Sequence, residues 1–583
     1  MSLGNLGSAP GALARPRAGA LPRRFSRFEP AMLIWIAAFA ALLFLVAGPV
    51  AKLVLSSLQD ADTGRFTLQN YVTAYGESRA VRALGTSLLY AAEVTVVAAV
   101  FAVPIAWGVA RTDMPGKGLV RALILGAFIT PSYLGAIGWI LLAGPNAGWL
   151  NLAWMGVTGS STGLVNVYSF SGLVWVTALY AFPYIFVFTT DALERVSSEM
   201  EEAANILGAG GLRTTLRVTL PLVTPAILGG AIVVFLDTVA LFGTPAIIAL
   251  PARVRVLTLE LWQFFQFPVR AEVAAAYAIP LILITLLLFS VQRMVLGRRG
   301  YVALTGKGGS RELQPLGPWR WVIFGYALLI VGMAVILPYA ALAQAAFSRA
   351  WGRGFSWDNL TLHNFHYLLI EDASARETII HSFTYSAVTA CLAVALALVV
   401  AYVVSRRLAG RVGGVLGLLC MVPLVIPGIV LAIGFYAAWA PPPIALYGTA
   451  AILIFGYAAR FLPIAYTSCL AAIRSLNPEM EDAVRILGGG RLRAVSRVVA
   501  PLLKTSLAGA WLLVFIPATR ELSTAIFLVS ANTRVISVMM LDLSENGSFE
   551  TLAALGFFLL GATILIVLLG YKLVGRDFML RRA

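Results

Sequence analysis

The chain has 583 residues, of which 60% are hydrophobic and only 12% are charged, and its mean hydropathy is +0.86. A soluble domain is about 25% charged, and its hydrophobic core stops growing at about 250–300 residues. Soluble, disordered and collagen-like proteins are therefore excluded, and a protein that crosses a membrane many times is expected. The net charge of +16 fits either a nucleic-acid partner or basic cytoplasmic loops.

Twelve mostly apolar runs are long enough to cross a membrane, because a spanning helix needs roughly 20 such residues. They cover approximately 31–57, 84–110, 119–143, 171–193, 219–244, 270–293, 320–346, 380–406, 411–437, 447–470, 500–530 and 550–574. Several runs are long enough to require a tilt or a break. Kinks are expected at Pro49, Pro104, Pro131 and Pro427.

An even number of spans puts both termini on the same side of the membrane. If that side is cytoplasmic, the tails and loops on it hold 30 of the 43 Lys and Arg residues. This asymmetry accounts for the basic charge without any nucleic acid. We therefore expect a cytoplasmic basic tail at 1–30, a six-helix module at 31–293, a cytoplasmic linker at 294–319 and a second module at 320–583.

The chain contains an internal repeat. The segment Glu199–Pro221 recurs at Glu479–Pro501 with an offset of 280, and 13 of the 23 positions are identical. Upstream, three further motifs recur at a slightly larger offset. They are Thr67-Leu68-Gln69-Asn70-Tyr71 with Thr361-Leu362-His363-Asn364-Phe365, Ser87 and Tyr90 with Ser382 and Tyr385, and Ala136-Ile137-Gly138 with Ala432-Ile433-Gly434. An even number of spans in each copy predicts two parallel halves, with a possible path along the axis between them.

The most similar parts of the two copies are hydrophilic loops that follow the fourth and tenth spans. Each loop begins with acidic residues, which favour a helix N-terminus, and continues with an apolar face. Glycines at 208–211 and 488–490 then predict a turn with positive φ. The apolar face either packs on the protein's own helix ends or binds another protein. Two matched copies favour a partner with two-fold symmetry.

The pattern E-A-A-x-x-x-G followed by I/V-x-x-P resembles the cytoplasmic loop of permease subunits of ATP-binding-cassette importers. Glu202, Ala203, Ala204 and Gly208 match it directly, and the second copy, Asp482-Ala483-Val484 with Gly488, matches it with two substitutions. In that family the loop forms a coupling helix that docks in a groove of the ATPase subunit. The resemblance implies that residues 199–217 and 479–497 each dock on one ATPase. The implied coupling residues are Glu201, Glu202, Ala203, Ala204, Gly208, Glu481, Asp482, Ala483 and Gly488.

Two further features resemble the fused permeases of ferric-iron importers. They are Arg520-Glu521-Leu522 after the second loop and Pro-x-x-x-x-Ala-Ile-Gly in the third and ninth spans. The resemblance implies an all-α type I importer permease fold in a bacterial inner membrane, with ferric iron as cargo. Sugar phosphates, phosphonates, thiamine and polyamines are the alternatives within the family. It also implies two ATPase copies that carry ATP and magnesium, a periplasmic or extracellular substrate-binding protein, and no cofactor or catalytic residue in this chain.

Charged residues inside spans usually face a cavity or a partner. Asp237, Arg460, Arg520 and Glu521 are accordingly candidates for the substrate path, with ion pairing between helices, for instance Asp237 with Arg520, as the alternative. His363 and His366 could share a helical face, but no carboxylate cluster accompanies them, and no metal site is expected.

Two other classes of protein remain as rivals. A secondary transporter with two parallel six-helix repeats would not explain the matched loops. A membrane-embedded enzyme would need clustered titratable groups at one interface, and the sequence has no such cluster.

Overall fold

The computed structural model describes residues 30–196, 198–297 and 313–574, and most of these residues lie in helices, with no strand among them. Ten helices in these ranges are long and apolar enough to cross a membrane. Those of the first half are α1–η1–α2 (Pro30–Leu42, Leu43–Ala47, Gly48–Ser57), α4 (Ser78–Arg111), α8 (Phe170–Arg195), η2–α11 (Thr215–Thr219, Leu220–Ala240) and α14 (Ala271–Gly297). Those of the second half are α15–η3–α16 (Trp319–Val331, Gly332–Ile336, Leu337–Ala346), α18 (Ala373–Ser405), α21 (Ala450–Arg474), η7–α24 (Val495–Val499, Ala500–Thr519) and α27 (Phe549–Val574).

The third predicted span of each half is a bent pair of helices. The first is α5 (Lys117–Ile129) with α6 (Ser132–Ala143), bent by 102°, and the second is α19 (Gly410–Val425) with α20 (Gly428–Trp439), bent by 114°. The breaks lie at Pro131 and Pro427, as predicted. The residue before each proline is extended, because the proline ring disfavours helical geometry there. With each bent pair counted as one span, the total is the predicted twelve.

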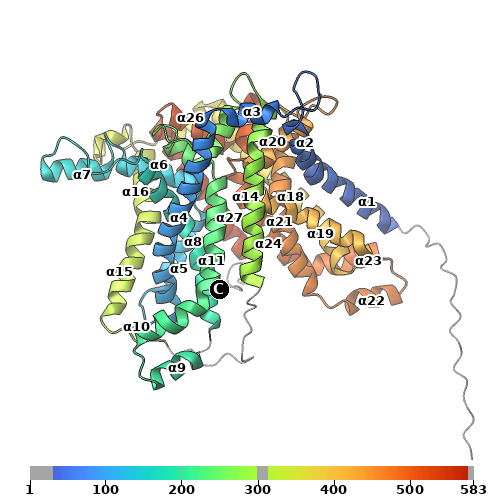
Figure 1. Ribbon diagram of the computed structural model, residues 1–583, viewed down its shortest axis with the longest axis horizontal. Helices are drawn as coiled ribbons and strands as arrows, with labels where there is room; N and C mark the ends of the chain where they lie inside the picture. Colours follow the sequence, from blue (N-terminus) through green and yellow to red (C-terminus); the bar gives the residue numbers. More distant parts are fainter. Residues whose placement is uncertain (1–29, 197, 298–312, 575–583) are drawn as a thin grey trace, which may run out of the picture.

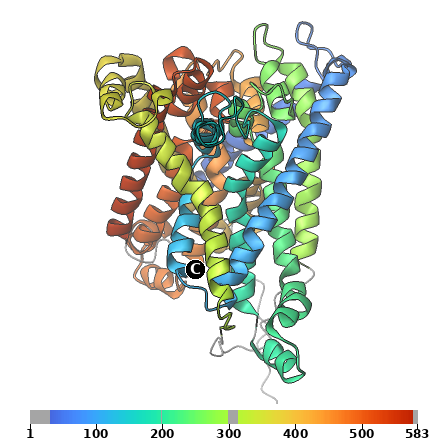
Figure 2. The same cartoon turned by 90° about the vertical axis from the view of Figure 1, so that its left-hand side faces the viewer.

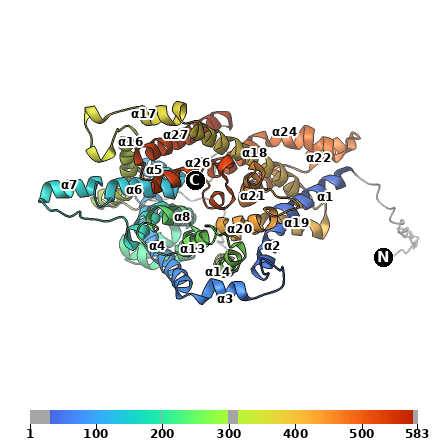
Figure 3. The ribbon, with the colours of Figure 1, turned by 90° about the horizontal axis from the view of Figure 1, so that it is seen from above.

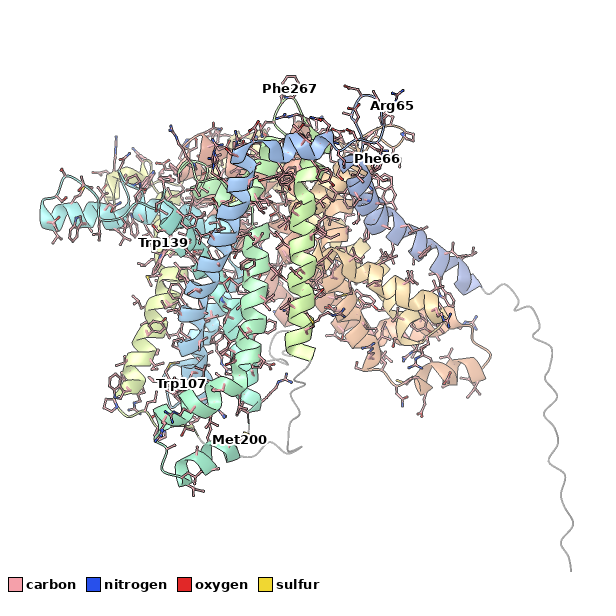
Figure 4. All side chains as sticks on the ribbon, viewed as in Figure 1. Arg65, Phe66, Trp107, Trp139, Met200 and Phe267 are labelled. Atoms are coloured by element: carbon pink, nitrogen blue, oxygen red, sulfur yellow. The ribbon has the colours of Figure 1, made fainter. Side chains whose placement is uncertain are left out.

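The short helices lie at the two ends of the bundle. At the lower end of Figure 1 are α9 (Ser198–Ile206) and α22 (Glu479–Ile486), each followed by a one-turn helix, α10 (Gly211–Thr214) or α23 (Arg491–Ala494). At the upper end are α3 (Gln69–Gly76), α7 (Trp149–Thr158) and α26 (Ile536–Glu545). Figure 4 shows Met200 at the lower end and Phe66 and Phe267 at the upper end. The remaining short elements are α12 (Gly243–Ile248), α13 (Leu257–Gln263), η4 (Trp351–Arg353), η5 (Trp357–Asn359), α17 (His363–His366), η6 (Tyr367–Glu371), α25 (Ala525–Leu528) and η8 (Ala531–Thr533).

The two halves exchange their first helices. Helix α1 and η1 pack against α18, α19 and α21 of the second half, and α15 packs against α4 and α5 of the first. Figure 2 shows α15 crossing in front of first-half helices, and Figure 3 shows α1 on the side of α18, α19 and α21. The ring of Phe44 stacks on Trp439 at 4.3 Å between centroids, and the Tyr326 hydroxyl donates a hydrogen bond of 2.9 Å to the Val100 carbonyl. The first helix of each half is therefore packed against the other half.

The repeated Ala-Ile-Gly motif lies where the halves cross most closely. A Cβ on Gly138 would lie 2.7 Å from the Pro338 Cβ, and one on Gly434 would lie 2.7 Å from the Pro49 carbonyl oxygen. Real Cβ atoms do not approach other atoms so closely, so only glycine fits at either crossing. The motif recurs because the same contact is made once by each half.

The other repeated polar residues satisfy backbone groups at the upper end. Asn70 donates to the carbonyls of Ser57 and Gln59, and Asn364 donates to those of Ala346 and Ser348. These carbonyls lie at the end of each first span, where intrahelical partners run out. In the same way, Ser87 accepts the Leu257 amide and Ser382 accepts the Ile536 amide, each at 2.7 Å.

Two predicted boundaries differ from the structure, and a third falls almost wholly outside the described residues. The predicted span at 500–530 is too long, since α24 ends at Thr519, two residues after Pro517. The predicted linker at 294–319 starts inside the last helix of the first half, because α14 continues to Gly297. Of the predicted basic tail at 1–30, only Pro30 lies within the described residues.

Candidate functional site

The two repeated loops fold into the same short motif. Gly208 and Gly488 both have φ of +83°, a conformation that glycine adopts without strain. In each loop the next amide bonds back into the helix, from Ala209 to the Ala204 carbonyl and from Gly489 to the Val484 carbonyl. These contacts end α9 and α22, as the glycines predicted.

An apolar tip on each loop projects away from the protein. Ile206 and Leu207 are 86% and 87% exposed, and Ile486 and Leu487 are 86% and 88% exposed. Of the two alternatives for the apolar face, packing on the protein's own helix ends therefore does not hold for these four side chains. We call them the two apolar tips. Large exposed apolar groups of this kind mark interaction surfaces.

The first-turn carboxylates Glu201 and Glu481 point the other way, into the bundle. Both are buried, and each pairs with an arginine at the lower end of a long helix. Arg111 Nη2 lies 2.9 Å from Glu201 Oε1, and Arg406 Nη2 lies 2.6 Å from Glu481 Oε1. Arg111 and Arg406 are themselves separated by the repeat offset that relates Ser87 to Ser382. The ion pair is thus a shared feature of the two halves.

Besides its arginine, each carboxylate has a hydroxyl group as a hydrogen-bond donor, and this donor differs between the halves. The Thr219 hydroxyl donates to Glu201 at 2.6 Å, whereas the Tyr402 hydroxyl donates to Glu481 at 2.7 Å. Buried charges are tolerated when they are paired and hydrogen-bonded, and the Arg406–Glu481 pair meets that condition. Arg111 and Glu201 are paired by distance alone, since Arg111 Nε and Nη2 are buried without a hydrogen-bond partner among the described residues. The glutamate is therefore buried in both halves, although its hydroxyl donor is a threonine in one half and a tyrosine in the other.

The end of the linker fastens the turn between α4 and α5. The Gln314 amide donates to the Arg111 carbonyl at 2.9 Å, and its carbonyl accepts from the Asp113 amide at 3.2 Å. The Asp113 carboxylate accepts from the Leu316 amide at 2.8 Å and lies 3.6 Å from Arg320. The linker therefore supports the Arg111 region of the first half.

The remaining predicted coupling residues lie on the same motif. Ala203 and Ala483 are exposed on it, Ala204 is half-buried, and Asp482 is exposed. The side chain of Glu202 lies outside the part of the chain that the structure describes.

Between the halves, at the corner of the first bent pair, lies a cavity of about 200 Å³. It brings together three of the four predicted path residues, Asp237, Arg520 and Glu521. Its other lining residues are Phe128, Thr130, Pro131, Ser132, Tyr133, Tyr180, Tyr184, Leu241, Gly243, Pro517, Leu522 and Ser523. The fourth predicted residue, Arg460, is not among them. Its Nη1 donates to the Ile426 carbonyl at 3.1 Å, at the corner of the second bent pair.

Asp237 and Glu521 have different surroundings. Glu521 accepts hydrogen bonds from the amide and the hydroxyl of Thr524, at 2.9 and 3.1 Å. The Asp237 side chain is exposed to the cavity and forms no ion pair with any residue that the structure describes, so the suggested pair with Arg520 is not made. Arg520 and Glu521 lie in the loop after α24 rather than inside a span.

Tyrosines of the cavity wall were missed from the sequence. The hydroxyls of Tyr133 and Tyr180 are buried and have no hydrogen-bond partner in the described ranges. Tyrosines in apolar spans usually belong to the core, so their residue type gave no signal. A comparison of the repeats would have found Tyr180, because Arg460 occupies its place at the offset of 280.

The histidines lie apart from both sites. His366 Nδ1 is 2.8 Å from Glu371 Oε1, both groups are exposed, and the His363 ring lies near Tyr367. No group of three or more metal-ligating side chains occurs within residues 30–196, 198–297 and 313–574.

Several known proteins are similar to this chain in sequence. Residues 31–300 match the family of inner membrane components of binding-protein-dependent transport systems. The molybdate/tungstate transport system permease protein WtpB of Pyrococcus furiosus is 30% identical over 219 residues, which cover 37% of this chain and 79% of that protein. The chain belongs to this family. It is the permease subunit of an ABC transporter and a multi-pass protein of the inner membrane.

Other relatives match nearly the whole permease. The ferric transport system permease protein FbpB of Actinobacillus pleuropneumoniae is 26% identical over 556 residues, covering 91% of this chain and 76% of that protein. A putative FbpB of Haemophilus influenzae is also 26% identical and covers 85% of this chain and 77% of its own length. Among solved structures, a bacterial ABC transporter for the import of alginate matches at 14% identity and a TM-score of 0.37, over 45% of this chain and 94% of that one.

Proposed function

We propose that this permease imports ferric iron, powered by two copies of an ATPase that dock on the loops containing α9 and α22. The observation that carries the docking is the pair of apolar tips, which are matched in conformation and in exposure. Two identical ATPase subunits need two equivalent surfaces, and the tips provide them. Ferric iron as the cargo rests on the relatives named for ferric transport, since these match the fused chain along most of its length.

The lower end of the bundle would then face the cytoplasm. The excess of Lys and Arg in the loops on that side supports this orientation, which also leaves both termini cytoplasmic. A substrate-binding protein would deliver its cargo to the opposite end. ATP and magnesium would bind to the ATPase subunits, and this chain would supply the path.

Each part of the site has a proposed role in this cycle. The tips, with Ala203, Ala483 and the adjacent acids Glu202 and Asp482, would form the docking surface. The glycines at 208 and 488 would shape the turn. Asp237, Arg520 and Glu521 would line the path at the cavity, while Arg460 would shape its wall from the second half. ATP-driven closure of the ATPase pair would shift the halves between two states that open on opposite sides.

Reconstitution tests this function. The permease is purified with the ATPase encoded beside it and placed in proteoliposomes with the matching binding protein. We expect one permease with two ATPase copies, and ATP-dependent uptake of ferric iron in preference to molybdate and sulfate. Uptake of an oxyanion instead would overturn the cargo, and uptake without ATPase, driven by an ion gradient, would overturn the whole assignment.

A paired variant tests the docking acids. Glu202→Ala combined with Asp482→Ala is expected to uncouple uptake from ATP hydrolysis without preventing membrane insertion. Normal uptake by this variant would remove these two acids from the docking surface.

A further inference from the structure

We propose that the buried ion pairs Arg111–Glu201 and Arg406–Glu481 are positioning elements that connect each ATPase-docking loop to the bent helix pair of its own half. The inference rests on the proposed docking at the apolar tips. It assigns to Glu201 and Glu481 a task different from contact with the ATPase, because both carboxylates are buried inside the permease.

Each arginine lies at the turn from a long span into a bent pair. Arg111 is the last residue of α4, and α5 begins at Lys117. Arg406 directly follows α18, and α19 begins at Gly410. A pull on either docking loop therefore reaches the start of α5 or α19 through one charged contact.

The helices that begin at these turns end at the cavity and at its counterpart. At 1.5 Å per residue, the 13 residues of α5 span about 20 Å and end at the corner where Thr130 and Pro131 line the cavity. The 16 residues of α19 span about 24 Å and end at Val425, next to Ile426, whose carbonyl accepts a hydrogen bond from Arg460. A hydrogen-bonded helix moves as a stiff unit, so displacement of the turn shifts the corner.

Charge pairing suits this task better than apolar contact. Apolar contact is non-directional, so two apolar surfaces can slide past each other. Two buried opposite charges cannot separate without leaving each uncompensated in a medium of low dielectric constant, which is strongly unfavourable. Arg406 holds Glu481 through Nε as well, at 2.8 Å, which also fixes the orientation of the pair.

The match between the halves supports a shared task. The arginine and the glutamate recur, whereas the hydroxyl donor changes from Thr219 to Tyr402. The linker segment at Gln314 reinforces the first turn from outside. The ion pair is thus common to both contacts between a docking loop and the turn before a bent helix pair, whereas the residues around it differ.

The test measures cargo moved per ATP hydrolysed by the full complex in proteoliposomes. Its variants are Glu201→Gln and Glu481→Gln, which keep the shape of the side chain and remove its charge. We expect both ATPase copies to stay bound, because the tips are unchanged. We expect uptake of ferric iron per ATP to fall at least about fivefold, the lower end of typical coupling between distant sites. Bound ATPase with a normal ratio would overturn the inference.

A double variant guards against misfolding. Arg111→Gln with Glu201→Gln leaves no orphaned charge, so it should accumulate even if the single variant does not. Its ratio should be as low as that of the single variant, which is the signature of two groups acting as one pair. A normal ratio in the double variant would overturn the inference.

The control and the parent complex separate the possible failures. Asp191→Asn removes an exposed pair with Arg195 on α8 and should leave the ratio unchanged, since exposed pairs contribute little. If the wild-type permease retains no ATPase, the docking proposal itself fails. If ATPase is retained and the variants stay coupled, only the ion-pair proposal fails.

Discussion

The lower ends of the two halves share several structural features, whereas the middle of the bundle differs between them. Both loops have a glycine at the same φ, a tip of the same exposure and a buried Arg–Glu pair. In the cavity, by contrast, Asp237 on α11 corresponds to Pro517 on α24 at the offset of 280, and Arg520 corresponds to Ala240. The two copies of the repeat are thus alike at the lower end and different at the cavity.

The proposed function accounts for this difference. Two identical ATPase subunits would present two identical surfaces, so each docking loop would have to keep the same shape. A single cargo would pass between the halves once, and its surroundings would need no symmetry. Three experiments test this contrast between a symmetric docking end and an asymmetric cavity.

The largest effect is expected at the apolar tips. Leu207→Asp and Leu487→Asp each place a charge where an apolar contact with the ATPase is proposed. Central contacts of an interface typically contribute about 2–4 kcal/mol, so each variant should weaken ATPase binding about 30- to 1,000-fold. Titration of the purified permease with ATPase measures this.

Equal losses at the two tips would support the symmetry, and a loss at only one tip would break it. Val157→Asp is the matched control. Val157 is 88% exposed on α7 at the opposite end, so this variant should bind ATPase normally.

The next effect concerns the exchange of first helices between the halves. Gly138→Ala and Gly434→Ala would each force a Cβ to within 2.7 Å of the other half. Overpacking of this kind costs about 1–3 kcal/mol, so the thermal midpoint of the purified permease should fall in both variants.

Gly85→Ala on α4 serves as the control, because no atom lies within 4 Å of its added Cβ. It should keep or slightly raise the midpoint, since alanine is the better helix former. An unchanged midpoint in either test variant would contradict the close crossing.

The smallest effect is expected from the asymmetric cavity. Asp237→Asn keeps the size of the side chain and removes the charge of its carboxylate. If that carboxylate faces the cargo, uptake should slow about tenfold, or about 1.4 kcal/mol in the barrier, with ATPase binding unchanged.

Pro517→Ala alters the corresponding position in the second half and should change uptake by less than about twofold. Both positions line the cavity, so the pair of variants compares them directly. Equal effects of the two variants on uptake would show that the cavity is functionally symmetric and would contradict its proposed asymmetry.

Much of the architecture could be predicted from the sequence. Span length, the repeat and the prolines are local signals, and they indicated two six-helix halves with breaks at Pro131 and Pro427. The glycines at 208 and 488 indicated where α9 and α22 end. The end of α24 was placed too late, because an apolar run does not reveal where a helix stops inside a membrane.

The sequence did not fully distinguish the roles of the individual residues of the site. The acids of each loop appeared as one cluster, and nothing in their spacing distinguished the buried Glu201 from the exposed tip that follows it. Arg111 directly follows the predicted span 84–110, where a basic residue fits an ordinary cytoplasmic loop. Its partner lies 90 positions further along the chain, so the pair is a long-range contact without a local signal.

Hydropathy, charge and internal identity are properties of short segments, so they were enough to predict a membrane protein of two parallel halves with two matched loops. The folded bundle was needed to show that each first helix packs on the opposite half, that one acid of each loop turns inward to an arginine, and that Asp237 meets Arg520 and Glu521 at one cavity. Such contacts depend on which helices become neighbours, and that choice is made by packing across the whole bundle.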